Sequence, residues 1–398
     1  MFPLLLSNDL LYCRKVSFKK CHVNDLIIIE KGRNVFTHRV IYKAGKYLIT
    51  KGDNNLVSDG KIYPHQILGK VYQVKRNGKV FHPENIYLLQ SSNYFQEIVK
   101  IKKAFEKEKI DFVFLKSLPL HLYFKKSHPR RIYADCDVLI DKLKKEKVKN
   151  ILKEMEYKKI NSSLSPIHTL LRQKQIEQSY YKKINGFTVV FDVHYEIDWM
   201  SAQIGKLNEL YPQYLIDKLT VDCLRNKKIV TINNREFSIL NTEFLILYLA
   251  LHFFHHNFRG TYRLDLLDKV IRMNLNNELL KQVQEDILKY KLQNFVYPVF
   301  LLLKKYYSTP LSRKFLDSIK PDERKMRYIQ KNILRINIFD DETRIQAGVT
   351  RFRNLFFLSL NPIWRKILII FNIQVLYSFI WVIIFSVNKL LRKYFKHE

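Results

Sequence analysis

Along residues 1–82, short apolar runs alternate with turn-forming residues. The runs are rich in β-branched and aromatic side chains, which favour strands. They occupy residues 10–16, 25–30, 35–42, 46–50 and 68–74. The segments between them contain the Gly, Asn and Asp that tight turns require. This pattern predicts a small all-β domain at residues 1–82.

Near residues 82–85 the apolar positions change to helical spacing, and we therefore place a domain boundary there. From residue 86 to 345, strand-like segments alternate with helix-like segments. Beyond Thr242 the pattern is almost wholly helical. Such a mixture predicts an α/β core with a helical C-terminal half. The expected fold class of the whole chain is therefore α+β, with an all-β domain at its N-terminus.

The C-terminal part, residues 346–398, is a basic and apolar tail. Its residues Ile367–Val387 form a run of 21 amino acids without a charge, preceded by Arg365 and Lys366. As a helix this run is about 30 Å long, enough to cross a bilayer core. Polar residues such as Asn372 weaken that interpretation. Two alternatives stay open: a helix buried in the protein core, or a segment that contacts an anionic membrane by spanning it or lying in its interface.

Composition narrows the class of protein. The chain has 69 Lys and Arg against 37 Asp and Glu, a net charge of +32, and it is 47% hydrophobic and 14% aromatic. This hydrophobic content excludes a disordered basic chain. The charge favours a polyanionic partner: nucleic acid, anionic lipid or a nucleotide. The basic residues are spread along the chain, so a biased composition is the alternative. We find no strong nucleic-acid signal, because the basic and aromatic stretch Tyr180–Lys183 is interpreted as a solvated helix end.

The cysteine content and the N-terminal sequence indicate the cellular compartment in which the protein is expected. The four cysteines contain no CxxC pair, which argues against a zinc site or a disulfide scaffold and favours a reducing compartment. The apolar N-terminal run stops at Asn8 and Asp9, too early for a secretory signal. We therefore expect a cytoplasmic protein, with membrane association through the C-terminal segment as an option.

An Asp-x-Asp pair provides the first candidate chemistry. Asp135 and Asp137 lie in an alternating run, and residues two apart on a strand point to the same face. Two such carboxylates repel each other unless a cation lies between them, and Mg²⁺ with a triphosphate is the usual partner. Asp192 lies in a second apolar run. Three acids on adjacent strands suit two-metal phosphoryl transfer. For an isolated Asp-x-Asp, a solvated strand face is the alternative.

The residues around these acids extend the pattern. The segments are Phe114–Ser117, Arg130–Ile140 and Phe191–His194, followed by His252 and the run Tyr262–Asp268. Together they resemble the uncharacterised nucleotidyltransferase family within the DNA polymerase beta superfamily. In that family a Leu-Lys-Gly turn precedes an Arg and an Asp-x-Asp, and an Asp-x-His strand and a Leu-Asp helix follow.

This resemblance, which covers about residues 105 to 275, implies a metal-dependent nucleotidyltransferase. Such an enzyme moves a nucleoside monophosphate from an NTP to a protein, peptide or small-molecule acceptor. It implies that Mg²⁺ or Mn²⁺ is held by Asp135 and Asp137, with Asp192 as the third ligand or the base.

The resemblance also implies a triphosphate-binding group. Lys116 and Arg131 would neutralise the triphosphate. Ser117 stands where the family has the glycine that lets backbone amides approach a phosphate, so the sequence departs from the family at this position.

A second ordered series lies in the N-terminal domain. Its blocks are Met1–Leu5, Asn24–Ile27, His38–Val40, Lys51–Asn55 and Gly69–Val71. In this order they resemble the signal-peptidase and LexA-like serine peptidase superfamily, in the subgroup with histidine as the base. The resemblance covers about residues 1 to 75.

That resemblance implies His38 as the base and Asp53 or Asp59 as the group that orients it. The nucleophilic serine would directly precede Met1, and Ser7 is a poor substitute for it. Three hypotheses follow. The first is a nucleotidyltransferase with a degenerate peptidase-like domain. The second is a membrane-associated serine peptidase whose serine lies upstream, and the third is a catalytically silent scaffold.

Overall fold

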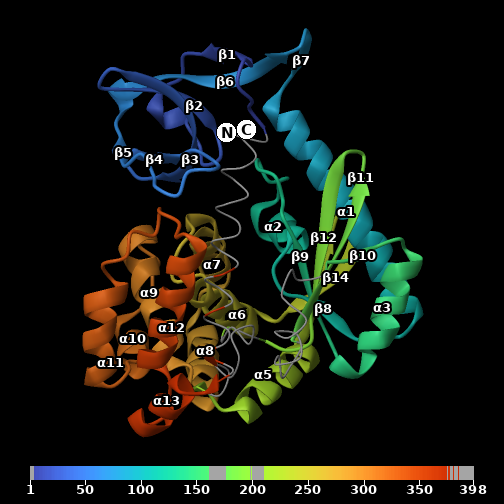
Figure 1. Ribbon diagram of the computed structural model, residues 1–398, viewed down its shortest axis with the longest axis vertical. Helices are drawn as coiled ribbons and strands as arrows, with labels where there is room; N and C mark the ends of the chain where they lie inside the picture. The colour runs from blue at the N-terminus through green and yellow to red at the C-terminus, as the bar shows by residue number, and fades with distance from the viewer. Residues whose placement is uncertain are drawn as a thin grey trace.

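The computed structural model describes residues 4–160, 176–197, 199, 210–373, 375–376, 380 and 384. It has three parts: an N-terminal β-domain, a central mixed sheet with helices beside it, and a helical C-terminal half (Figure 1). The fold class predicted from the sequence, α+β with an all-β domain first, is confirmed.

The β-domain is a seven-stranded antiparallel sheet in the order β1-β6-β2-β3-β4-β5, with β7 paired to β6. Its strands are β1 (Leu10–Arg14), β2 (Leu26–Lys31), β3 (Asn34–Lys43), β4 (Leu48–Lys51), β5 (Lys61–Ile62), β6 (Ile67–Arg76) and β7 (Lys79–Phe81). Gly69 is needed where β1 crosses β6, because a Cβ there would lie 2.9 Å from the carbonyl oxygen of Arg14. Two small apolar clusters form the core of this domain.

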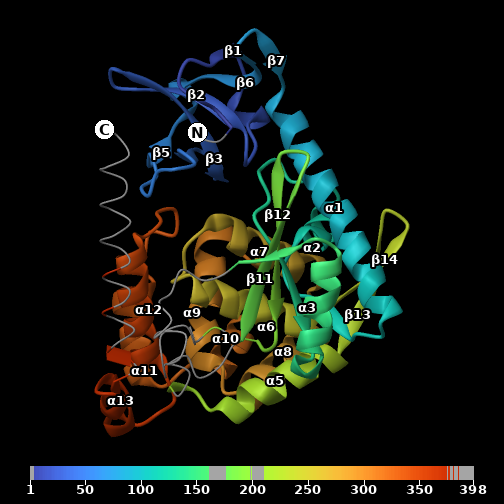
Figure 2. The ribbon, with the colours of Figure 1, turned by 45° about the vertical axis from the view of Figure 1, so that its right-hand side comes forward.

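Helix α1 (Pro83–Lys107) joins the β-domain to the central sheet (Figure 2). It begins at a proline, which is well suited to the first turn of a helix because no partner is needed for its missing N–H. Tyr87 packs into the β-domain core, whereas Tyr94 and Ile98 pack into the large core around the central sheet. One continuous helix therefore belongs to both parts.

The central sheet has the strand order β10-β11-β12-β9-β8-β14-β13. The strands are β8 (Phe112–Phe114), β9 (Cys136–Ile140), β10 (Lys158–Lys159), β11 (Glu177–Ile184), β12 (Phe187–His194), β13 (Lys227–Ile232) and β14 (Arg235–Leu240). Strands β9 and β12 are parallel neighbours, and Asp137 lies directly opposite Asp192. Helices α2 (Leu118–Lys125) and α3 (Lys145–Glu154) pack beside this layer.

The interpretation of Tyr180–Lys183 as a solvated helix end is wrong. These residues lie in β11, hydrogen-bonded along their length to β12. The Tyr180 side chain is buried. Pairing with β12 thus overrides the polar character that suggested a helix end.

The C-terminal half is helical. Its helices are α5 (Gln213–Arg225), α6 (Thr242–His255), α7 (Thr261–Asn274), α8 (Asn277–Lys289), α9 (Gln293–Tyr307), α10 (Arg313–Ser318), α11 (Glu323–Tyr328), α12 (Arg344–Leu358) and α13 (Ile363–Ile370). Helix α6 is apolar on nearly all sides, and it packs against α7, α8 and α9. The same hydrophobic core therefore continues from the central sheet into this half.

The β-domain rests on the helical half through polar contacts and through the Tyr42 ring, which packs against Tyr307 and Phe339. The Tyr42 hydroxyl donates to the carbonyl oxygen of Tyr306 at 2.6 Å, and the Thr261 hydroxyl donates to that of Ile41 at 2.8 Å. The Ser58 hydroxyl donates to Asp340 at 2.8 Å. The two parts therefore enclose the space between them without merging their cores.

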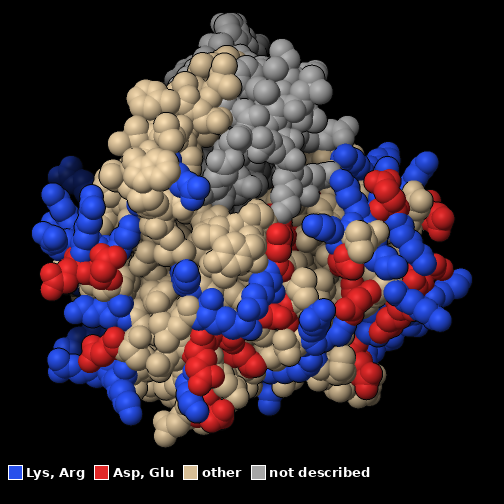
Figure 3. Space-filling model, turned by 90° about the horizontal axis from the view of Figure 1, so that it is seen from below, with Lys and Arg blue, Asp and Glu red and all other residues tan. Residues whose placement is uncertain are grey.

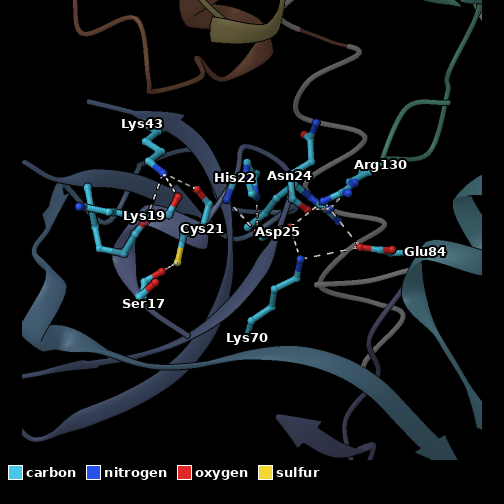
Figure 4. Close-up of polar contacts among 12 residues, drawn as sticks. Ser17, Lys19, Cys21, His22, Asn24, Asp25, Lys43, Lys70, Glu84 and Arg130 are labelled. Atoms are coloured by element: carbon cyan, nitrogen blue, oxygen red, sulfur yellow. Dashed lines mark hydrogen bonds and ion pairs between the residues drawn. The ribbon is translucent and has the colours of Figure 1, made fainter. Parts of the chain in front are cut away.

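A buried carboxylate ties the β-domain to the central part (Figure 4). Asp25 lies 2.7 Å from the Lys70 ammonium and 3.4 Å from the Arg130 guanidinium. Glu84, on α1, lies within 3.8 Å of both cations. The loop that leads into β9 is therefore anchored to the β-domain through Arg130.

Within the predicted C-terminal segment 367–387, residues 374, 377–379, 381–383 and 385–387 lie outside the described part of the chain. Among the described residues, none forms a helix with the length and apolar character needed to cross a bilayer. Viewed from below, Lys and Arg are interspersed with Asp and Glu on this face of the molecule (Figure 3).

Candidate functional site

Three carboxylates converge at the edge of β9 and β12. Asp135 immediately precedes β9, Asp137 lies on β9, and Asp192 lies on β12. Because the two strands are parallel and in register, the side chains of Asp137 and Asp192 share one face. One ligand oxygen from each of the three acids lies within 4.8 Å of the others. The structure thus brings together the three acids that the sequence singled out.

The carboxylates have unmet bonding capacity. Asp137 Oδ2 and Asp192 Oδ1 are buried; the Lys116 ammonium lies 3.0 Å from Asp137 Oδ2, whereas Asp192 Oδ1 accepts no hydrogen bond from a described residue. A buried carboxylate oxygen without a donor is costly, and a cation is its natural partner. Oxygen-only donors suit hard divalent cations such as Mg²⁺ or Mn²⁺. The residues present therefore fit the metal that the family implies.

Lys116 supplies positive charge to this cluster. Its Nζ lies 3.2 Å from Asp135 Oδ2 and 3.0 Å from Asp137 Oδ2. Burial alone would lower the pKa of Lys116, but the two carboxylates outweigh burial and raise that pKa above its ordinary value. Lys116 therefore remains charged in the site.

His194 is a further member of the cluster. Its Nε2 lies 2.9 Å from Asp137 Oδ1, and its Nδ1 lies 3.7 Å from Glu177 Oε2. Burial would lower the pKa of His194, but the hydrogen bond and charge of Asp137 raise it to about 9. We had not assigned a role to His194. The sequence feature that could have pointed to His194 is its position two residues after Asp192, because this spacing puts both side chains on one face of a strand.

Asp192 differs from Asp137 in the direction of its pKa shift. Burial, followed by the charge of Asp137, raises the pKa of Asp192 to about 6. The pKa of Asp137 is instead lowered: burial would raise it, but Lys116 and His194 outweigh burial. The two carboxyl groups are therefore pushed apart in acidity, an arrangement that is common where acid–base chemistry occurs.

A cavity of about 1210 Å³ opens beside the acids. Lys116, Ser117 and Arg131 line it together with Asp135 and Asp137. On its other side lie β-domain residues, which are Asn24, Arg39, Ile41, Tyr42, Lys43, Gly52 and Asp53. We call this cavity the interdomain cleft. It is larger than the 300–1,000 Å³ of a typical small-molecule pocket.

Ser117 is buried at the start of α2. Its backbone is extended, with φ at 170°, a conformation open to any residue. The serine in place of the family glycine therefore causes no backbone strain. What it adds at this position is a side chain between the helix N-terminus and the cleft.

The N-terminal candidate site is arranged differently from our expectation. His38 Nδ1 lies 2.7 Å from Asp59 Oδ2, and the Thr50 hydroxyl donates to the same oxygen at 2.7 Å. Asp53 instead forms a two-pronged ion pair with Arg39, both contacts at 2.8 Å. Of the two acids that the sequence offered, Asp59 orients His38 and Asp53 does not.

No described serine hydroxyl hydrogen-bonds to the His38 ring, and Ser7 is exposed. The residues Met1 to Pro3, which belong to the peptidase-like series, lie outside the described part of the chain. Gly52 leaves room for the ring, because a Cβ there would lie 2.9 Å from His38 Nε2. This region therefore supplies an oriented histidine without a described nucleophile.

The mixed sheet with its carboxylate cluster defines the class as nucleotidyltransferase-like. Residues 85–308 match the family described as an uncharacterised nucleotidyltransferase, and the chain belongs to that family. The match is longer than the region in which the sequence motifs were recognised. The β-domain, up to residue 82, lies outside it.

Solved structures give distant similarities. The antibiotic-resistance factor ANT(2'')-Ia is 10% identical, with a TM-score of 0.26 over 55% of this chain and 95% of that one. An antigenic nucleotidyltransferase-like protein from Paracoccidioides brasiliensis is 12% identical, with a TM-score of 0.32 over 61% of this chain and 96% of that one. No curated protein matches the chain.

Proposed function

We propose that this protein is a metal-dependent nucleotidyltransferase that transfers a nucleoside monophosphate from an NTP to an acceptor. The observation that carries the proposal is the cluster of Asp135, Asp137 and Asp192, whose ligand oxygens lie within 4.8 Å of one another. Asp192 Oδ1 is buried without a hydrogen-bond donor among the described residues, and the buried Asp137 Oδ2 is ion-paired with Lys116. Family membership agrees with this chemistry.

Each residue of the site would have a separate role in the transfer reaction. Divalent cations held by the three acids would neutralise the triphosphate and the charge that develops on its oxygens. Asp192, with its pKa near 6, would accept the proton of the acceptor hydroxyl. A bond forms between the acceptor oxygen and the α-phosphorus as the bond to the β-phosphate oxygen breaks and pyrophosphate leaves. Lys116 would hold the leaving phosphates, and His194 would orient Asp137.

The acceptor would lie in the interdomain cleft. Its volume of about 1210 Å³ exceeds what one nucleotide-sized ligand needs, so there is room for a second substrate. β-Domain residues form one wall, so the acceptor would contact that domain. A protein, a peptide and a small molecule all remain within this proposal.

The direct test is transfer from an NTP labelled on its α-phosphate, with Mg²⁺ or Mn²⁺ present and the protein itself included as a candidate acceptor. We expect label transfer that EDTA abolishes and that Asp135→Asn lowers by on the order of a hundredfold or more. Metal-independent nucleotide binding, with no effect of Asp135→Asn, would remove the proposal.

A second candidate function is peptide hydrolysis by the β-domain. The observation that favours it is the chain of hydrogen bonds from Thr50 through Asp59 to His38. The test uses a protein extended upstream of Met1 by its genomic reading frame. If a serine directly precedes Met1, proteolysis should appear and should be lost in His38→Ala. Without a nucleophile there, the β-domain would serve as a docking platform.

We also propose that the C-terminal tail of a cytoplasmic protein contacts an anionic membrane surface. Trp364, Leu368 and Phe371 are exposed, and Arg365 lies between them in the sequence. Exposed apolar residues beside basic ones suit an anionic lipid interface. The full chain should sediment with anionic vesicles, and a form ending at Pro362 should stay in the supernatant. A folded full chain that ignores such vesicles would refute this.

A further inference from the structure

Two arginines in the interdomain cleft differ from the other cations there. Most lining cations have a carboxylate partner: Arg39 with Asp53, Lys51 with Asp341, Lys125 with Asp265, and Lys116 with Asp135 and Asp137. Lys43 and Lys305 donate to backbone carbonyls instead. Within the described part of the chain, Arg131 and Arg263 form no ion pair, although both line the cleft.

Both guanidinium groups lie over the same aromatic ring. The Cζ atom of Arg131 is 4.1 Å from the centroid of Tyr262, and that of Arg263 is 4.4 Å from it. A guanidinium stacks through its flat face, so its N–H groups stay directed outward in the plane. Stacking therefore holds the two cations in place and leaves most of their donors available to a ligand.

The local backbone is built around Arg263. Gly260 precedes helix α7 with φ at +91°, and a Cβ there would lie 2.4 Å from Arg263 Nη1. Only glycine allows both this backbone conformation and this position of the guanidinium. Arg263 Nη1 donates to the carbonyl oxygen of Arg259 at 3.2 Å, while Nε is buried without a partner among the described residues.

Burial makes this arrangement costly without an anion. It lowers the pKa of Arg263 below the ordinary value, and the nearby charge of Arg131 acts in the same direction. The charge of Asp135 partly opposes this effect, which places Arg263 within electrostatic reach of the carboxylate cluster. An anionic group bound by both arginines would remove the cost.

We propose that Arg263 joins Arg131, which the family resemblance already assigned to the triphosphate, in a phosphate-binding site built on Tyr262 beside the three carboxylates. The inference rests on the proposed function, because it places a phosphate-bearing substrate in the same cleft. A phosphate group offers the oxygen pairs that a guanidinium binds in a two-pronged manner. The phosphate has two possible sources: the leaving pyrophosphate of the NTP, or a phosphate carried by the acceptor.

The test is calorimetric titration of pyrophosphate, and separately of ATP with Mg²⁺, into the full chain and its variants. Arg263→Gln and Arg131→Gln should each weaken pyrophosphate binding by about tenfold or more, the usual effect of losing a charge-assisted contact. Lys269→Gln is the matched control, because it removes one positive charge from the same helix without lining the cleft. Arg263→Lys keeps the charge without the two-pronged geometry, and it should show a smaller loss than Arg263→Gln. Thermal melting checks that each variant is folded, and Arg131→Gln provides the test if an Arg263 variant does not fold.

The results distinguish the two possible sources of the phosphate. They also distinguish failure of this inference from failure of the proposed nucleotidyltransferase function. If ATP and pyrophosphate affinities fall together, the site serves the nucleotide. If only pyrophosphate affinity falls, and pyrophosphate still binds to protein saturated with ATP, the site serves an acceptor-borne phosphate. If ATP fails to bind while pyrophosphate binding depends on Arg263, the proposed function fails and the phosphate site stands. Pyrophosphate binding that is absent, or equal in folded wild type, Arg131→Gln and Arg263→Gln, overturns the inference.

Discussion

Two histidine–carboxylate pairs in the described part of the chain have similar geometry but different surroundings. His194 lies 2.9 Å from Asp137 in the central sheet, and His38 lies 2.7 Å from Asp59 in the β-domain. The second oxygen of Asp137 is also buried, and it lies 3.0 Å from the Lys116 ammonium. Asp59 uses one oxygen for both His38 and the Thr50 hydroxyl.

The comparison of the two pairs shows that a histidine–carboxylate pair does not by itself define a function. Around Asp137, two more carboxylates favour binding of a cation, and Lys116 favours an anionic substrate. Around Asp59, the hydrogen bonds are made within the domain, and the oriented histidine has no described nucleophile. The site around Asp137 differs from the site around Asp59 because it gathers three carboxylates, and the buried Asp192 Oδ1 has no hydrogen-bond donor among the described residues.

The largest expected effect comes from Asp137→Asn. The variant loses one charge at the centre of the carboxylate cluster and changes the partner of His194, so nucleotidyl transfer should fall by on the order of a hundredfold or more. Transfer of α-labelled NTP measures this loss. Asp141→Asn is the control, since an asparagine oxygen can still cap the Leu143 N–H, and it should leave transfer unchanged. Full activity in a folded Asp137→Asn protein would contradict the assignment.

The second prediction compares the effects of replacing His194 and His38 on nucleotidyl transfer. His194→Ala should reduce transfer by roughly 10- to 100-fold, because a group that orients a metal ligand typically has an effect of that size. His38→Ala should leave transfer nearly unchanged. Metal titration of both variants should show weaker Mg²⁺ affinity in His194→Ala alone. Equal losses in the two variants would mean that the β-domain histidine takes part in the same reaction.

The third prediction concerns metal and pH. In the metal-free protein, burial raises the pKa of Asp192 from 3.8 to about 6, so the folded state loses stability as pH rises through that range. Below about pH 6 a proton on Asp192 also competes with a cation. The gain in Tm on adding Mg²⁺ should therefore be larger at about pH 7.5 than at about pH 5, by a few degrees.

Calorimetry in EDTA and in Mg²⁺ at the two pH values measures this gain. In Asp192→Asn the gain should be smaller and should lose much of its pH dependence. A gain that is independent of pH in the unaltered protein would argue against Asp192 as a metal ligand.

The smallest expected effect is that of Ser117→Gly. The serine backbone is extended and unstrained, so glycine removes only a buried side chain at the start of α2. Transfer should be preserved or rise modestly if backbone amides at this turn bind phosphate. KM for the NTP is the sensitive measurement. A marked loss of kcat would instead assign a role to the serine hydroxyl.

Sequence reasoning worked where the information was local. The spacing of Asp135 and Asp137 places both acids at one strand by periodicity alone, and Pro83 gave a helix start close to the expected boundary. Strand β11 and the hairpin β13–β14 were not predicted, because their polar residues obscure the alternation that marks a strand. Both pairings are local, and the turns Asn185–Gly186 and Asn233–Asn234 were the available hairpin signals.

The choice between Asp53 and Asp59 depends on information that is not local in the sequence. His38 and Arg39 are neighbours on β3 and point to opposite faces, so the two acids go to different partners. The pairing of β3 with β4, with an irregularity between Val40 and Tyr42, decides which acid reaches which side. Sequence alone places both acids near the histidine without separating them.

The anchoring of Arg130 to Asp25 has a mechanical consequence. If the β-domain lifts away from the core, Lys70 stays with Asp25, so no buried charge is stranded, while the half-exposed Arg130 returns to water. The hydrophobic cores on the two sides are separate, and the β-domain meets the helical half through hydrogen bonds and through packing of Tyr42 against Tyr307 and Phe339. Separation of the two parts at this point would therefore break an ion pair without leaving a buried carboxylate unpaired.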